Sequence, residues 1–204
     1  MNIVETPLLE KLAAAEFGPR EALTLRRHLS VTPESRKELR DMLSNFDSAL
    51  APHLPQGEVQ VRHGAFLWAC GEAQEASRVL KDQGLNHTAG FLSAMIKMEA
   101  GDYQAASDLF AQSASAAADA SADLAAQAEC LLKLGMNDQA ANIIENAAKK
   151  FPDAPEIKYV QGLLAEAEGD QQQALDHYES ALAGNPQLPG ANFRASSPGE
   201  GCPR

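Results

Sequence analysis

The chain has 204 residues and a formal net charge of −11 at pH 7. Apolar residues make up 45% of it, which is enough for a buried core and argues against a disordered tail. Aromatic residues make up only 5%, which favours closely packed helices over a β-sandwich, so the predicted fold class is all-α. The negative charge argues against a general binder of nucleic acid or of anionic membranes.

Membrane insertion and secretion are also disfavoured. The chain contains no run of about 18 apolar residues, and its first residues include Glu5 and Glu10 where a secretory signal has a basic start and a long apolar core. Three cysteines, Cys70, Cys130 and Cys202, lie far apart and are odd in number, which argues against a disulfide framework. We therefore expect a cytoplasmic protein without a membrane span.

Residues 1–56 are expected to form a small helical region that ends in a linker containing Pro52 and Pro55. This region holds a cluster of basic residues: Arg20, Arg26, Arg27, Arg36, Lys37 and Arg40. Three interpretations stay open for the cluster. It binds a second partner, it folds onto the acidic remainder of the chain, or it belongs to an ordinary solvated pair of helices.

The chain from residue 87 onward repeats itself every 34 residues. Glycines recur at this spacing, with a small residue seven positions before each and an alanine and a large apolar residue after it. The residues in phase are Gly101, Gly135 and Gly169; Ala94, Ala128 and Gly162; Ala106, Ala140 and Ala174; and Phe110, Ile144 and Tyr178. The glycine is predicted to end a first helix, the small residues to let two helices approach closely, and the large residue to fill the core. Asp102, Asn137 and Asp170 are predicted to cap the second helices.

This pattern resembles the tetratricopeptide repeat, a helix–turn–helix unit of 34 residues. Segments 121–154 and 155–188 carry most of the family's positions, while 87–120 carries the earlier ones, and all three lack the family's early tryptophan. Segment 57–86 keeps the spacing of Gly64, Gly71 and Ala76 and is interpreted as a divergent repeat. The resemblance implies a right-handed α-solenoid with three repeats over 87–188. Residues 189–204 are interpreted as a disordered or truncated tail.

No residues are predicted to catalyse a reaction or to bind a cofactor or a metal. The five histidines lack metal-ligand spacing, and phosphate-binding, dinucleotide-binding and zinc-protease motifs are missing from the sequence. Acidic residues such as Glu168 and Asp170 are more typical of a solvated helix face than of an acid–base pair. We therefore expect a protein that is not an enzyme.

In the family that the chain resembles, the first helix of each repeat lines a concave groove that binds partner proteins. The groove residues implied by this resemblance are Phe91, Leu92, Met95, Met98, Glu129, Leu132, Lys133, Tyr159, Val160, Leu163 and Glu166. Members of the family that grip the C-terminal carboxylate of chaperones use Lys, Asn and Arg here, whereas this groove has only Lys133. An apolar or basic peptide or helix suits such a surface better.

The leading hypothesis is a non-catalytic scaffold that binds a protein segment in this groove. One alternative is a chaperone of secreted or assembling subunits that forms a homodimer through its N-terminal helices. The other is a docking fragment of a larger repeat-containing enzyme, because the repeats are interrupted near Pro189. The sequence does not decide between the three.

Overall fold

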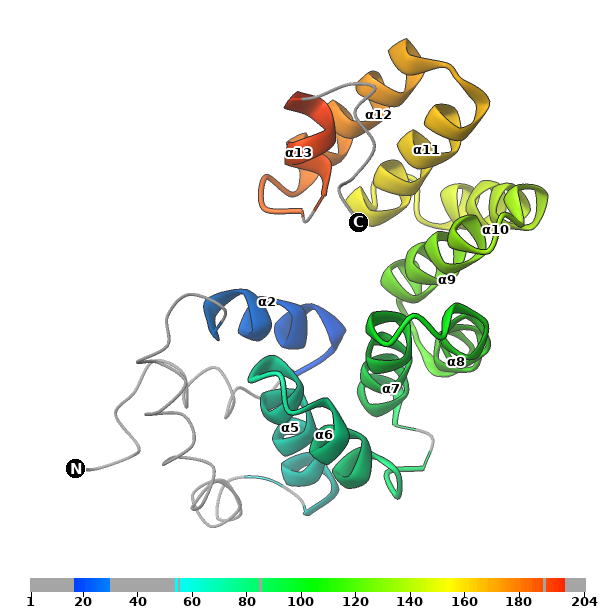
Figure 1. Cartoon of the computed structure of the whole chain (residues 1–204). Coiled ribbons are helices and arrows are strands. Elements are labelled where there is room, and N and C mark those ends of the chain that lie inside the picture. The colour runs from blue at the N-terminus through cyan, green and yellow to red at the C-terminus, as the bar shows by residue number, and fades with distance from the viewer. Residues whose placement is uncertain (1–16, 30–53, 55, 85, 189, 197–204) are drawn as a thin grey trace. The chain divides into compact units, whose positions relative to one another are not determined.

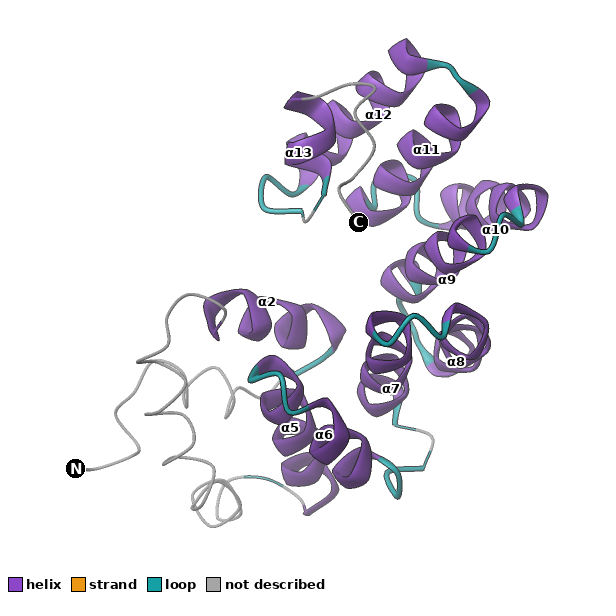
Figure 2. Ribbon diagram, viewed as in Figure 1, coloured by secondary structure: helices purple, strands orange, loops and turns teal. Residues whose placement is uncertain are grey.

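The protein is all-helical in the part that the structure describes. The computed structural model describes residues 17–29, 54, 56–84, 86–188 and 190–196, and these contain ten α-helices and no strand (Figures 1 and 2). The chain divides into two compact units, residues 1–100 and 101–204, and each is described by itself. The predicted fold class, all-α with helix–turn–helix repeats, is confirmed.

Unit 1 is a helical hairpin with a helix from earlier in the chain and a helix from later in the chain packed on it. Its helices are α2 (Pro19–Leu29), α5 (Gln56–Ala69), α6 (Ala73–Leu80) and α7 (His87–Glu99). Helices α5 and α6 form the hairpin, and α2 packs on both α5 and α7. Trp68, Leu80 and Leu92 lie at the centre of this core.

Unit 2 consists of stacked helices, four of which form two helix–turn–helix pairs. Its helices are α8 (Tyr103–Ala116), α9 (Ser121–Lys133), α10 (Asn137–Lys150), α11 (Pro155–Glu168), α12 (Gln171–Gly184) and α13 (Ala191–Ser196). Helices α9 and α10 form one hairpin and α11 and α12 the next, and α11 packs on both α9 and α10. Ile144, Ile157 and Val160 are buried between the two hairpins.

The repeated small residues act as the sequence predicts. In the α11–α12 hairpin, a Cβ atom added to Gly162 would lie only 2.6 Å from Cδ1 of the buried Tyr178. In the α5–α6 hairpin, a Cβ atom added to Gly64 would lie 2.5 Å from Leu80. The repeated glycines end their helices, as Gly169 does for α11 with a φ of 87° that glycine adopts without strain.

The predicted helix caps are partly wrong. Asp102 and Asp170 cap α8 and α12, since their carboxylates accept hydrogen bonds from the backbone amides three residues later. Asn137 does not cap α10, because the chain enters that helix one residue earlier and Met136 takes the cap position. The Asn137 side chain is therefore not used as a helix cap.

The described residues include only parts of the predicted N-terminal region, 1–56, and of the predicted tail, 189–204. Helix α13 occupies residues 191–196, inside the segment interpreted as a disordered or truncated tail, and it packs on α12 with Ala191 fully buried. Pro198 and the glycines around it, from which the tail is predicted, follow this helix. The rest of the predicted tail lies outside the described residues, as do residues 1–16 and 30–53 of the predicted N-terminal region.

Candidate functional site

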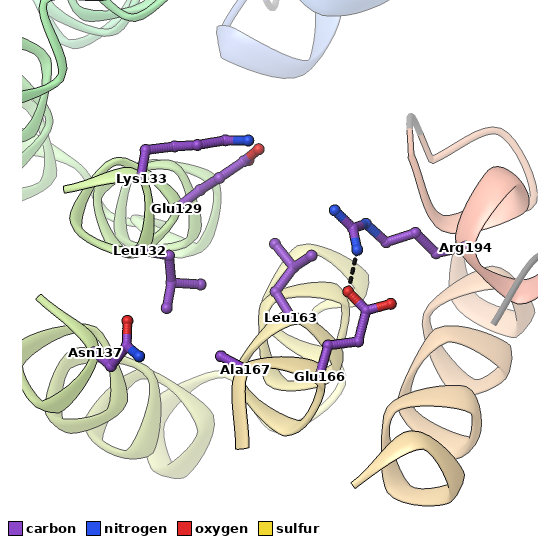
Figure 3. Close-up of a pocket in the computed structure, with 8 residues that line it drawn as sticks. All are labelled: Glu129, Leu132, Lys133, Asn137, Leu163, Glu166, Ala167 and Arg194. Carbon is purple, nitrogen blue, oxygen red and sulfur yellow. Dashed lines mark hydrogen bonds and ion pairs between the residues drawn. The ribbon is translucent and has the colours of Figure 1, made fainter. Parts of the chain in front are cut away.

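Unit 2 contains a pocket of about 310 Å³ between its first helices and α13 (Figure 3). Helix α9 supplies three of the residues that line it, α11 supplies three more, and α10 and α13 supply one each. These residues are Glu129, Leu132, Lys133, Asn137, Leu163, Glu166, Ala167 and Arg194. Polar and charged groups stand around two leucines, so the pocket combines an apolar floor with a charged rim.

The pocket is built by one set of positions used in two consecutive repeats. Residues 129, 132 and 133 share one face of α9, since positions three and four apart are neighbours on a helix. The residues 34 positions later, 163, 166 and 167, share the corresponding face of α11. The repeat that was read from the sequence therefore places both walls of the pocket.

One wall of the pocket carries a partly buried ion pair. Arg194 of α13 donates to Glu166 of α11, and their side chains are only 15% and 22% exposed. Burial alone would lower the pKa of Arg194, but the negative charge of Glu166 and the nearby Tyr178 and Tyr159 outweigh burial and raise it. Burial and the charge of Glu166 also raise the pKa of Tyr178. The guanidinium is therefore held in its charged form against a carboxylate of the first helix.

Glu129 lies on the opposite wall in a different electrostatic state. Burial raises the pKa of its carboxyl group, and the positive charges of Lys133 and Arg194 only partly offset this effect. Within the described part of the chain, the Glu129 carboxylate makes no hydrogen bond and no ion pair. The Glu129 side chain is partly buried at the edge of the pocket, and its carboxylate lies near the Lys133 amine (Figure 3).

The structure brings together only some of the residues implied by the family resemblance. Five of the eleven line the pocket: Glu129, Leu132, Lys133, Leu163 and Glu166. Phe91, Leu92 and Val160 are buried, with at most 1% of their surface exposed, so they cannot present a surface to a partner in this structure. Tyr159 is partly buried, with its ring centre 5.8 Å from that of Tyr178.

The remaining two predicted groove residues, Met95 and Met98, lie on α7 in unit 1 and are partly buried. Met95 packs against the core of that unit, together with Phe17 and Leu23 from the N-terminal region. Met95 therefore contributes to the packing of unit 1.

Three residues of the pocket lie outside the predicted set of eleven: Asn137, Ala167 and Arg194. Arg194 lies beyond the last repeat, so no repeat position marks it. Asn137 was assigned to a helix cap, although its side chain lies at the pocket. Ala167 had a signal, because it lies 34 residues after the predicted groove residue Lys133.

In unit 1 an arginine of α2 reaches the end of α7. Arg26 lies with its guanidinium carbon 4.3 Å from the centre of the Trp68 ring and donates to the Trp68 carbonyl at 2.9 Å. The same guanidinium lies 3.0 Å from the Glu99 carboxylate, which also accepts a 3.1 Å hydrogen bond from the Trp68 indole nitrogen. For Arg26, the interpretation in which the basic cluster folds onto the acidic repeats is therefore correct. Arg36, Lys37 and Arg40 lie outside the described residues.

Metal binding and membrane insertion find no support in the described residues. Within 17–29, 54, 56–84, 86–188 and 190–196, no group of three or more His, Cys, Asp or Glu residues could hold a metal ion. The helices of the same part of the chain include none long and apolar enough to cross a bilayer.

The fold and the pocket define a class of protein made of repeated helix pairs with a partly charged pocket on their first helices. Residues 125–189 match a family model described as the tetratricopeptide repeat. A curated protein of Pseudomonas putida, the probable biofilm formation methyltransferase WspC, is 39% identical over 61 residues, which are 30% of this chain and 14% of that protein. The chain contains tetratricopeptide repeats, as the 34-residue period predicts.

Several solved structures share the fold, and two of them are described as tetratricopeptide proteins. A chain of the APC/C hetero-tetramer Cut9–Hcn1 superimposes with a TM-score of 0.67 at 13% identity, over 85% of this chain and 32% of that one. The protein TTC0263 of Thermus thermophilus gives 0.62 at 16% identity, over 88% and 98% of the two chains. YrrB, described as a tetratricopeptide protein with an unusual peptide-binding site, gives 0.55 at 15% identity, over 94% and 98%. The chain thus corresponds to a small part of WspC and a third of the Cut9–Hcn1 chain, and to nearly all of the other two.

Proposed function

We propose that this chain is a non-catalytic protein-interaction scaffold that binds a peptide or helical segment of a partner protein in the unit 2 pocket. The observation that carries the proposal is that equivalent positions of two consecutive repeats line the same pocket. The same three positions of two consecutive repeats form the two walls of one pocket with an apolar floor. Stacked repeats present the same helix face side by side, so together they form an elongated surface that a bound segment can contact along its length.

The helices that form the walls are held in place before any partner arrives. Val160 and Ile157 of α11 and Ala128 of α9 are buried in the core behind the pocket. Binding to such a preformed surface requires little ordering of the scaffold itself, which leaves more of the interaction energy for affinity. A peptide-binding site is also described for YrrB, whose fold this chain shares.

The test is a binding screen with a library of synthetic hexapeptides, comparing the wild-type chain with Leu163→Glu. A carboxylate in place of Leu163 removes part of the apolar floor, so at least some bound peptides are expected to be lost. Leu134→Glu is the matched control, because Leu134 is 39% exposed and does not line the pocket. The proposal is refuted if every peptide that binds the wild type binds Leu163→Glu equally well while circular dichroism shows that variant folded.

A second candidate is that the repeats act as a docking part of a larger enzyme. The match to 14% of a protein named as a methyltransferase favours it, because there a segment of this kind belongs to a longer chain. Sequencing the gene beyond codon 204 tests this candidate: a continued reading frame supports it, and an immediate stop codon contradicts it.

The chaperone alternative and its homodimer stay predictions. The one N-terminal helix in the described part, α2, packs on α5 and α7 of its own chain. Sedimentation of the full chain with and without residues 1–50 would test the dimer, which requires a larger mass only when these residues are present. The predicted cytoplasmic location would be tested by fractionation of the source cells.

A further inference from the structure

Two acidic and two basic side chains line the unit 2 pocket, but they do not form two ion pairs. Glu166 is paired with Arg194, and both side chains are largely buried. Glu129 and Lys133 form no ion pair in the part of the chain that the structure describes, and Lys133 is exposed to solvent. Glu129 is partly buried and lies within the electrostatic reach of Lys133 and Arg194, so it is the acidic side chain of the pocket that is not held in an ion pair.

Partial burial of a carboxylate that makes no hydrogen bond is unfavourable, and a bound cation would relieve this cost. A small inorganic cation would fit the charge but would make no use of the leucines beside it. Leu132 and Leu163 line the same pocket, and Leu163 lies between Glu129 and Glu166 in the view of Figure 3. An arginine or lysine side chain fits both features, because its aliphatic stem packs on apolar surface while its head stays with polar groups.

The molecule already binds two of its own arginines in a related way. In unit 2, Arg194 reaches across the end of the pocket to Glu166 on the first helix of a repeat. In unit 1, Arg26 reaches Glu99, which occupies the same repeat position as Lys133 and Ala167. In both units, an acidic residue late in a first helix therefore accepts a guanidinium from a helix outside the repeat.

We propose that the pocket receives an arginine or lysine side chain of the partner segment, with Glu129 as the acceptor and Leu132 and Leu163 as the surface for its stem. The proposal rests on the function proposed above and names the partner's chemistry: a segment with a basic residue among apolar ones. An acidic segment is the opposing candidate, since Lys133 would attract it. Glu129 and Glu166 would repel such a segment, and Arg194 is already engaged.

The experiment uses the full chain and three sets of acetylated, amidated hexapeptides that are identical except at one central position. The position holds arginine, norleucine, which has an uncharged stem, or glutamate. Wild type is expected to bind the arginine set at least about tenfold more tightly than the norleucine set, as a charge-assisted hydrogen bond in a partly desolvated site allows. Glu129→Gln keeps the shape of the side chain and is expected to abolish the preference.

Two further variants complete the test. Glu168→Gln makes the same change on the exposed end of α11 and lies outside the pocket, so it should keep the wild-type preference. Lys133→Ala removes a competing positive charge from an exposed position and is expected to increase the preference for arginine. It provides a test even if Glu129→Gln does not fold.

The outcomes separate this proposal from the one on which it rests. A wild-type preference for norleucine or glutamate overturns the basic-residue proposal, and so does a preference for arginine that survives in Glu129→Gln. If peptides are lost on Leu163→Glu whatever their central residue, the scaffold function stands and the basic-residue proposal fails. If no peptide is sensitive to Leu163→Glu, both fail.

Discussion

The replacement Gly162→Ala tests whether small residues set the helix spacing in these repeats. In a helix interior, alanine is more favourable than glycine by up to about 1 kcal/mol, so propensity alone predicts a gain in stability. The packing predicts the opposite, because the new Cβ atom would lie 2.6 Å from Cδ1 of Tyr178, well inside van der Waals contact. Tyr178 is 1% exposed, so its ring is enclosed by other parts of the protein.

Overpacking of a well-filled core costs about 1–3 kcal/mol, which exceeds the helix-propensity gain. We therefore expect Gly162→Ala to lower the free energy of unfolding by about 1–2 kcal/mol, measured by urea titration with circular dichroism. Hydrogen exchange should show the loss of protection concentrated in residues 155–184. The control is Gly57→Ala in α5, where an added Cβ meets nothing within 4 Å and the change should be neutral or stabilising by up to about 1 kcal/mol. A Gly162→Ala chain at least as stable as wild type would refute the role assigned to this position.

Three further predictions concern single side chains. Arg26→Ala should destabilise unit 1 by about 1–2 kcal/mol in urea titration and shift the fluorescence of Trp68, since the arginine contacts its ring and pairs with Glu99; an unchanged spectrum would contradict this. Glu129→Gln should raise the free energy of unfolding at pH 7, because burial raises the pKa of Glu129 above 4.5 and its ionisation therefore costs stability. The gain, measured by urea titration, should vanish below pH 4.5, where the carboxyl group is protonated in both the folded and the unfolded chain. Equal stability of the variant and the wild type at every pH would contradict this prediction. Burial and the charge of Glu129 raise the pKa of Cys130 to about 12, so mass spectrometry should find it unalkylated by iodoacetamide at pH 8 until urea unfolds the chain.

The repeat could be predicted from the sequence because close helix packing leaves a strong mark on residue type. Only a glycine fits at Gly162 against Tyr178, and the turn after α11 needs the positive φ of Gly169. Such requirements recur in every unit, so they appear as a period. The same logic predicted the fold class correctly.

The candidate groove could be predicted only in part, because a repeat position specifies a helix face but not what else covers that face. Val160 and Leu163 belong to the same predicted set on α11, and yet one is buried in the core and the other lines the pocket. The difference comes from the neighbouring hairpin, whose distance from each residue is a property of the tertiary structure. Arg194 could not be predicted at all, since no repeat position and no motif marks it.

The residues outside the repeats have the largest effect on what this surface can bind. In unit 1, Phe17 and Leu23 pack against the same core as the predicted groove residue Met95. In unit 2, Arg194 neutralises Glu166 and leaves Glu129 as the acidic group facing the pocket. In unit 2 the repeats thus supply an acidic and apolar face, and Arg194 of the flanking helix α13 changes the charge that this face presents. Specificity in this protein is therefore expected to depend on short segments that no repeat pattern describes.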